Sequence, residues 1–344
     1  MSAEAARAEA GWRAVAVLYN ALMTGLVLSL VSRKGEAAAA EFIFRHFRRQ
    51  HLEKFLPGLE KLGLADQPPA LAAALYHFHS NALGGVKTEY FAESPTKAWV
   101  RYPPPRWIWR GAAVCGIPTP VNAAMLHGWH GHNGVSLNEP RLGFVCTGQI
   151  TEGDPGLEGY YHLADRPLAE DERVRFAPDE RMPAFDPASQ PKLPVADWPA
   201  ERLARTHRAY AVEYLRSLTP TLQDLLGPAE GMAELARVAR LIGLQYQEEV
   251  AGLLPGLSPL DLIGALLAAH GETVAHDGET LVQTGWKTMA GVELPDLLAA
   301  FEAWTALFGG LVSAVDRFAR LEVQSSSGAD GATARWTISS AARR

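Results

Sequence analysis

Hydrophobic and polar positions follow two different periods along this chain. In some stretches apolar residues recur every three or four positions, as on one face of a helix, and in others they alternate with polar residues, as in a half-buried strand. In the first half, the expected helices and strands are helices over 14–31, 36–55, 71–83 and 120–131, a hairpin over 86–102, and strands over 141–151 and 157–164. This alternation predicts an α+β fold in which helices pack on small antiparallel sheets.

The second half repeats this order of elements. Its expected elements are a helix over 260–269, a hairpin over 274–286, a helix over 294–308, and strands over 320–325 and 333–339. The sequence Leu-Pro-Gly-Leu occurs at 56–59, where we expect it to end a helix, and again at 254–257. Matching order along both halves indicates an internal duplication. The alternative is that a common turn and an ordinary alternation of elements recur by chance.

Two further pairs of residues keep the same order in both halves. Trp99 pairs with Trp286, and Arg141-Leu142 pairs with Arg320-Leu321. Residues 176–200 are rich in proline and read as a linker. We therefore expect a first α+β half over 1–175, a linker over 176–200, and a second, degenerate α+β half over 201–344. Both cysteines and most histidines lie in the first half, which indicates a chemical half and a supporting half.

One apolar stretch bears on the question of a membrane. Residues 14–31 contain no charged residue, and the length of this stretch is close to the lower limit for a membrane-spanning helix. The stretch includes Asn20, Thr24 and Ser29, and no small-residue cleavage site follows it, so a signal peptide is disfavoured. We expect a buried core helix, with a membrane segment as the alternative.

Composition narrows the class of protein. The 344 residues are 48% hydrophobic and 20% charged, which excludes a disordered chain, and the net charge of −6 disfavours a nucleic-acid binder. Only two cysteines occur, so the reducing cytoplasm is the expected location. A homo-oligomer is also compatible with the sequence. No GxxxxGK[ST], strand-linked GxGxxG or GxSxG motif is present, which argues against kinases, Rossmann dehydrogenases and α/β-hydrolases.

The densest group of reactive side chains is a cluster of three histidines. His127, His130 and His132 lie within six residues, around Trp129 and two glycines. Imidazole nitrogens are good ligands for Zn or Fe, so these three are the candidate ligands of a divalent metal. The alternatives are that His130 and His132 act as hydrogen-bonding or general-base groups, or that the segment is a packed turn without a chemical role.

Four other residues in this half are candidates for chemistry. Glu89, in the first strand of the hairpin, is a candidate proton carrier, although exposed strand carboxylates are common. Cys115 precedes a glycine in a loop and is a candidate nucleophile, whereas Cys146 reads as a core residue. One member of the pair His77 and His79 can join the histidine cluster, and we favour His79.

Aromatic residues crowd the same part of the chain. The candidates for contact with a small-molecule ligand are Trp107, Trp109, Trp129 and Tyr160. An aromatic pocket suits a planar or cationic ligand, and ordinary core packing is the alternative.

Two motifs follow the expected hairpin and helix. Residues 140–144 read Pro-Arg-Leu-Gly-Phe at the start of a strand, and 149–155 read Gln-Ile-Thr-Glu-Gly-Asp-Pro before the last strand. From about Lys97 to Ala164 this layout resembles the L-2-amino-thiazoline-4-carboxylic acid hydrolase-like family. The resemblance implies an α+β fold and hydrolysis of a small cyclic C–N compound. The family's cysteines are not at the matching places, where the histidine cluster and Leu157-Glu158 stand, so the resemblance implies a changed nucleophile or ligand set.

The sequence as a whole predicts a cytoplasmic hydrolase or lyase that acts on a small organic molecule. In this hypothesis the histidines bind a metal, which lowers the pKa of a bound water, or act as general bases. Two alternatives from other classes are a small-molecule sensor or carrier without catalysis, and a structural partner subunit. Neither nucleic acid nor a membrane is an expected partner.

Overall fold

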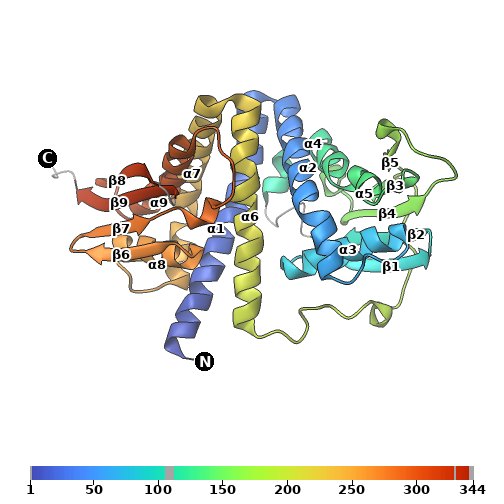
Figure 1. Cartoon of the computed structure of the whole chain (residues 1–344), viewed down its shortest axis with the longest axis horizontal. Coiled ribbons are helices and arrows are strands. Elements are labelled where there is room, and N and C mark those ends of the chain that lie inside the picture. Colours follow the sequence, from blue (N-terminus) through green and yellow to red (C-terminus); the bar gives the residue numbers. More distant parts are fainter. Residues whose placement is uncertain (1, 105–111, 329–330, 341–344) are drawn as a thin grey trace. The chain divides into compact units, whose positions relative to one another are not determined.

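The computed structural model describes residues 2–104, 112–328 and 331–340 of the chain. Their contacts divide into two compact units: unit 1 comprises Met1–Leu26 and Pro199–Arg344, and unit 2 comprises Val27–Trp198. This division differs from the expected boundaries at the N-terminus, because residues 1–26 group with the second half of the chain. Helices pack on one small sheet in each unit, as the sequence predicts (Figure 1).

Unit 2 is built on a five-stranded sheet with the strand order β1-β2-β4-β3-β5. The strands are β1 (Glu89–Ser94), β2 (Lys97–Tyr102), β3 (Leu142–Gly148), β4 (Leu157–Leu163) and β5 (Val174–Phe176). Neighbouring strands are antiparallel, except that β5 runs parallel to β3. The sequence did not indicate β5, since three residues carry no periodic signal.

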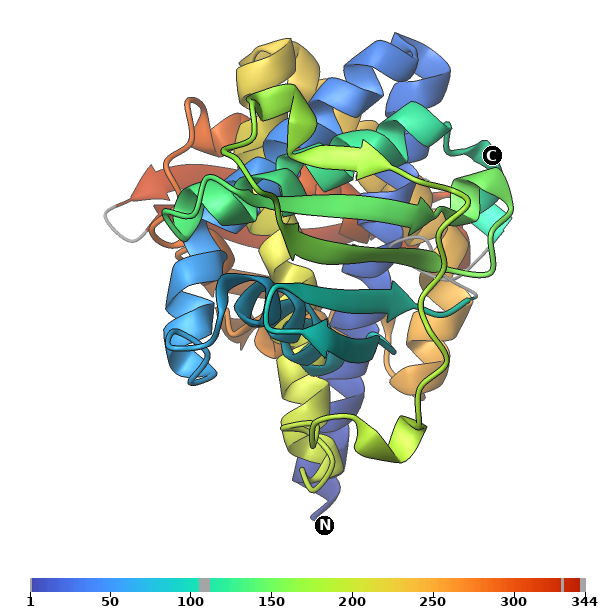
Figure 2. The same cartoon turned by 90° about the vertical axis from the view of Figure 1, so that its right-hand side faces the viewer.

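The helices of unit 2 pack on one face of this sheet, here called the inner face. They are α2 (Glu36–Lys61), α3 (Pro69–Leu83), α4 (Thr119–Gly128) and the short α5 (Asn133–Ser136). Figure 2 shows the opposite, outer face, with helices behind the sheet. The Leu-Pro-Gly-Leu sequence at 56–59 does not end α2, because Pro57 lies in its last two turns and the helix continues to Lys61.

The proline-rich segment is not a free linker. Ala177 and Met182 pack on the outer-face cluster of Trp99, Val145 and Tyr160, and Gln190 Oε1 accepts a hydrogen bond from the Tyr90 amide at 3.1 Å. Helices cover one face of β3 and this segment covers the other, so every residue of β3 is buried.

Unit 1 repeats the same plan. Its strands are β6 (Thr273–Asp277), β7 (Thr280–Thr284), β8 (Ala319–Gly328) and β9 (Gly331–Ser340), in the antiparallel order β6-β7-β9-β8. Its helices are α6 (Ala200–Leu226), α7 (Pro228–Leu253), α8 (Pro259–His270), α9 (Leu297–Val315) and the first part of α1 (Ala3–Lys34). The order β6-β7-β9-β8 matches β1-β2-β4-β3 strand for strand. The two halves therefore share one topology, and β5 is an addition in unit 2.

Two helices in the described residues, α1 and α9, are long and apolar enough to cross a membrane by length and composition alone. Half or more of the most apolar stretch of each is buried inside the protein. The core helix of a globular protein meets the same criterion. In unit 1, α1 contributes Tyr19, which is fully buried beside Trp304 and His270.

Candidate functional site

The histidine cluster of the sequence lies in a sharply turning segment of unit 2. His127 is in the last turn of α4, a single 3-10 turn carries His130 and His132, and α5 follows at once. Two glycines allow this path, because a Cβ at Gly128 would lie 2.7 Å from the Phe44 carbonyl oxygen, and one at Gly134 would lie 2.7 Å from that of Leu142. The segment is thus pressed between α2 and the inner face of the sheet.

His130 belongs to a fully buried network of hydrogen bonds. The Tyr161 hydroxyl on β4 lies 2.7 Å from His130 Nδ1 and accepts a hydrogen bond from Asn133 Nδ2 at 2.9 Å. The His130 ring stacks on His77 of α3, with centroids 4.2 Å apart and planes 9° apart. Asn133 Nδ2 also lies 3.5 Å from His77 Nε2. Since Asn133 donates to the hydroxyl, the phenolic proton of Tyr161 is available for His130 Nδ1.

A second histidine pair adjoins this network. His51 of α2 is fully buried, and its Nε2 lies 2.8 Å from the Oγ of Ser136, the last residue of α5. The His51 ring lies edge-on to His132 at 5.2 Å and to Trp129 at 5.5 Å. Three elements, α2, α3 and the 3-10 turn, therefore contribute to one group of four histidines, which we call the histidine core: His51, His77, His130 and His132.

Burial keeps the imidazoles of the histidine core neutral. It lowers the pKa of His51 and His130 to about 3 and that of His132 to about 4, and it holds the pKa of His77 well below its usual value. Electrostatic interactions with the neighbouring His132 and Arg48 oppose protonation of His51 and lower its pKa further. Each ring therefore offers one N–H donor and one nitrogen acceptor at neutral pH. Burial also raises the pKa of Tyr161, so its hydroxyl keeps its proton.

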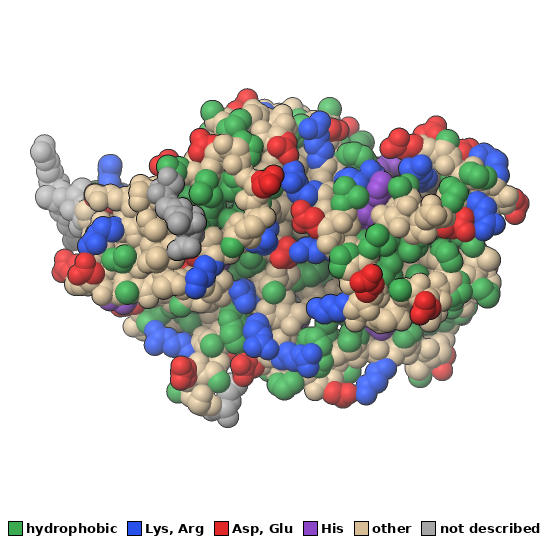
Figure 3. Space-filling view, in the orientation of Figure 1, with side chains coloured by type: hydrophobic (Ala, Val, Ile, Leu, Met, Phe, Trp, Pro, Cys, Tyr) green, Lys and Arg blue, Asp and Glu red, His purple; other side chains and the backbone are tan. Residues whose placement is uncertain are grey.

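Four polar atoms in and around the histidine core are buried and make no hydrogen bond to any residue that the structure describes. They are His51 Nδ1, His132 Nδ1, Trp129 Nε1 and Asn133 Oδ1. Most buried polar atoms in proteins are paired, so each exception calls for a physical account such as a bound molecule. His127 and His132 are partly exposed, and histidine side chains reach the surface in the region of α4 and α5 (Figure 3). The group thus has one side near solvent.

The structure does not bring His127, His130 and His132 together around one point. The ring of His127 faces Phe176 at 6.4 Å, that of His130 faces His77 and Tyr161, and that of His132 faces His51. Among the described residues, no group of three or more His, Cys, Asp or Glu side chains is placed to hold a metal ion. A divalent metal stays a prediction of the sequence.

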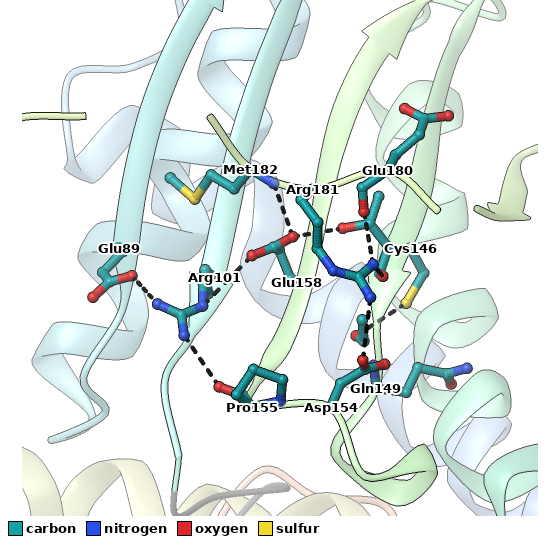
Figure 4. A network of polar contacts seen from close by, with 12 residues as sticks. Glu89, Arg101, Cys146, Gln149, Asp154, Pro155, Glu158, Glu180, Arg181 and Met182 are labelled. Carbon is teal, nitrogen blue, oxygen red and sulfur yellow. Dashed lines mark hydrogen bonds and ion pairs between the residues drawn. The ribbon is translucent and has the colours of Figure 1, made fainter. Parts of the chain in front are cut away.

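Glu89 lies on the other face of the sheet from the histidine core. Its carboxylate accepts a hydrogen bond from Arg101 Nη1 at 2.8 Å, and Arg101 also lies 3.5 Å from Glu158 (Figure 4). Because side chains alternate along β4, Glu158 and Tyr160 point outward while Tyr161 points toward the helices. Glu89 is therefore not placed to carry a proton for the histidines.

The outer face holds a second polar network around Glu158. Glu158 Oε1 accepts hydrogen bonds from Thr147 Oγ1 and the Met182 amide, both at 2.9 Å, and Arg181 donates to the Thr147 carbonyl at 2.7 Å (Figure 4). These bonds tie residues 181–182 to strands β3 and β4. Every partner is a protein group, so we assign this network a structural role.

The other predicted residues fall in several places. Cys115 is exposed in the 3-10 turn Ala112–Gly116, whereas Cys146 is buried on β3 and its thiol pKa is raised to about 12. Tyr160 packs on Trp99 on the outer face, with ring centroids 4.5 Å apart. Trp129 is part of the site, and Trp107 and Trp109 lie outside the described residues. His77 belongs to the core, whereas the favoured His79 is only half-buried and contacts Phe78.

Four residues of the site were not among the predicted site residues: His51, Asn133, Ser136 and Tyr161. His51 lies in a basic stretch of α2 that reads as a solvated face, yet Arg48 of the same stretch donates to the carbonyl oxygens of His127 and Gly128. These two bonds join α2 to the end of α4. A half-buried arginine that bonds to a distant helix end leaves no mark in a single sequence.

Comparisons with known proteins identify no relative. No protein-family model, no curated protein and no solved structure matches this chain. The function must therefore be argued from the site alone, and the resemblance to the thiazoline-carboxylate hydrolases stays an expectation.

Proposed function

We propose that unit 2 binds a small polar organic molecule at the histidine core and hydrolyses it. The observation that carries the proposal is the set of four buried polar atoms that have no partner among the described residues, on His51, Trp129, His132 and Asn133. Leaving such an atom unpaired costs about 1–3 kcal/mol, so a ligand that pairs with several of them gains that free energy on binding. These atoms include a fixed donor, the indole N–H, and a fixed acceptor, the amide oxygen.

Neutral imidazoles support the hydrolytic part of the proposal. A histidine that is unprotonated at neutral pH can take a proton from water or from a hydroxyl group. The family resemblance makes a cyclic C–N compound the first class of substrate to test. A divalent metal would use the same imidazole nitrogens, so metal content belongs in the first experiment, measured beside a His127→Ala/His130→Ala double variant.

A sensor or carrier without catalysis is the second candidate. The low pKa values of His51 and His130 favour it, because a base with a pKa of about 3 is a weak proton acceptor. Both candidates use the same site and differ only in turnover. A product found by mass spectrometry supports hydrolysis, and tight binding of an unchanged ligand supports the carrier.

The test is a screen of thiazolines, imidazolines and lactams by thermal shift, followed by mass spectrometry for addition of water. The diagnostic variant is Trp129→Phe, which removes an indole N–H without a partner in the described part of the chain. We expect it to weaken the affinity for a ligand about 10-fold, which corresponds to about 1.4 kcal/mol. The matched control is Trp99→Phe, which removes an N–H that donates to Glu93 on the outer face. Equal affinity for both variants, or no ligand in the screen, would count against the site.

A further inference from the structure

Ser136 and His51 form a pair of a hydroxyl and an imidazole at the edge of the histidine core. The Oγ atom of Ser136 and Nε2 of His51 are 2.8 Å apart, although the residues are 85 positions apart in the chain. The serine is partly exposed and the histidine is fully buried behind it. A nucleophilic hydroxyl needs this arrangement, with one side open to a substrate and a base within hydrogen-bond reach.

The surrounding side chains hold this pair in place. The His51 ring stacks on Phe55 at 4.8 Å and lies edge-on to Trp129 and His132, which limits its rotation. A Cβ at Gly134 would lie 2.7 Å from the Leu142 carbonyl oxygen, so the short helix that ends at Ser136 packs closely on the start of β3. Catalytic groups act efficiently only when their geometry is fixed in this way.

The bonding state of His51 matches the role of a proton acceptor. Its Nδ1 makes no hydrogen bond to residues 2–104, 112–328 or 331–340, so no neighbour in these ranges forces the proton onto Nε2. With the proton on Nδ1, the Nε2 lone pair accepts the hydrogen bond from the Ser136 hydroxyl. The imidazole is neutral at physiological pH because burial disfavours its charged form, and the same low pKa limits its strength as a base, so the assignment rests on the geometry of the pair.

We propose that Ser136 is a nucleophile for acyl transfer, that His51 is its general base, and that the substrates are small carbonyl compounds such as esters and lactams. This inference rests on the proposed function, since it assigns the bond-breaking step to two residues of the same site. It also replaces Cys115 and the metal-bound water of the sequence hypothesis by a hydroxyl nucleophile.

The chemical step balances without any other reactant except water. Ser136 Oγ forms a bond to the carbonyl carbon, and its proton passes to His51 Nε2. The bond from that carbon to the leaving oxygen or nitrogen breaks, and the leaving group takes the proton from His51. Water then attacks the acyl-serine ester, gives a proton to His51, and releases the carboxylic acid while Ser136 Oγ recovers that proton.

The experiment uses the full chain and a fluorophosphonate, which reacts with activated serines without the natural substrate. Ser136 Oγ displaces fluoride from phosphorus, and intact-mass measurement with peptide mapping locates the adduct. We expect one adduct per chain, on Ser136, absent from Ser136→Ala and retained in Ser94→Ala, whose serine is the last residue of β1 in the same unit. We expect His51→Gln to slow the labelling at least about 100-fold, the usual effect of losing a general base.

An adduct on another residue, or no adduct on Ser136, overturns the inference. Equal labelling rates for the wild type and His51→Gln overturn the role of His51. The wild-type peptide map decides the first point even if Ser136→Ala fails to fold. The two proposals can be told apart. If a ligand binds the wild type but not Trp129→Phe, and no fluorophosphonate adduct forms, the binding site is supported and only the serine mechanism is refuted.

Discussion

Replacing Tyr161 by phenylalanine tests whether the buried network around His130 is as important as its geometry indicates. The substitution removes one oxygen and keeps the ring, which packs on Phe144 at 5.0 Å and on His130 at 5.7 Å. The hydroxyl is completely buried, so water cannot take its place at no cost. Two partners lose their bond at once: His130 Nδ1 and Asn133 Nδ2.

The magnitude follows from those two partners. A buried polar group left without a hydrogen bond costs about 1–3 kcal/mol. Asn133 Nδ2 keeps only a long contact of 3.5 Å with His77, so its loss is poorly compensated. We expect Tyr161→Phe to lower the free energy of unfolding of unit 2 by about 3 kcal/mol. For a unit of this size, that loss corresponds to a fall in melting temperature of about 6–12 °C.

The adjacent residue provides a matched control. Tyr160 occupies the same strand, but its hydroxyl points to the outer face, where it donates to Glu180 at 2.7 Å and accepts from Arg175 at 3.2 Å. Both partners are partly exposed and can bind water after the change. We expect Tyr160→Phe to cost less than about 1 kcal/mol.

Urea unfolding followed by circular dichroism measures both variants. We expect the urea concentration at the midpoint of unfolding to be much lower for Tyr161→Phe than for Tyr160→Phe. The slope of the free energy of unfolding against urea concentration should be unchanged. If Tyr161→Phe stays within about 0.5 kcal/mol of the wild type, the network contributes nothing net to stability. If both variants lose the same amount, the contrast between the two faces is refuted.

Three further predictions concern stability. Gly134→Ala should cost about 1–3 kcal/mol of stability, because its Cβ would lie 2.7 and 2.8 Å from backbone oxygens. Gly252→Ala, whose Cβ would meet no atom within 4 Å, should stabilise the protein by up to about 1 kcal/mol, and equal melting temperatures for the two variants would contradict this. Glu272→Gln should cost about 2 kcal/mol, since its carboxylate accepts two backbone N–H bonds at 2.8 Å in unit 1, and exposed Glu302→Gln should be neutral by urea unfolding. The free energy of unfolding should be constant above about pH 6.5 and fall toward pH 3. Three buried histidines have pKa values of about 3 in the folded protein, so below about pH 6.5 the unfolded chain binds protons that the folded protein does not bind. A urea midpoint that rises on acidification would contradict this. These histidines are His46, His51 and His130.

Local periodicity explains why the fold was predictable. The hairpins, the paired strands and the helices each carry their own signal in the spacing of apolar residues, and the matching order of the two halves follows from it. The grouping of residues 1–26 with unit 1 was not predictable, because an apolar helix does not encode which sheet it covers. The role of residues 176–190 was also missed, since proline-rich composition marks an irregular segment but not its packing surface.

The site was predictable only in part, because its residues converge from distant elements. His130 and Trp129 were found, since their segment is dense in histidine. His51 and Ser136 meet only because α2 lies against the end of α4 and α5, which no spacing rule reveals. Glu89 was predicted as a proton carrier, but its register opposite Arg101 places it on the outer face of the sheet. A shift of one position moves a strand residue to the other face, and the sequence does not give the register.

The two units share a topology but treat their buried histidines differently, and this contrast supports unit 2 as the chemical unit. In unit 1 both nitrogens of His270 are bonded, Nε2 to the Tyr19 hydroxyl and Nδ1 to the Leu266 carbonyl, each at 2.6 Å. Trp304 Nε1 donates to the same hydroxyl at 2.6 Å, so that group is complete as a structural core. In unit 2, His51 and His132 each keep an Nδ1 that bonds to no residue the structure describes. The fold can thus bond both nitrogens of a buried imidazole in unit 1, yet unit 2 keeps two imidazoles whose Nδ1 atoms have no partner among the described residues. These unpaired atoms cost stability, and a bound ligand that pairs with them would offset that cost.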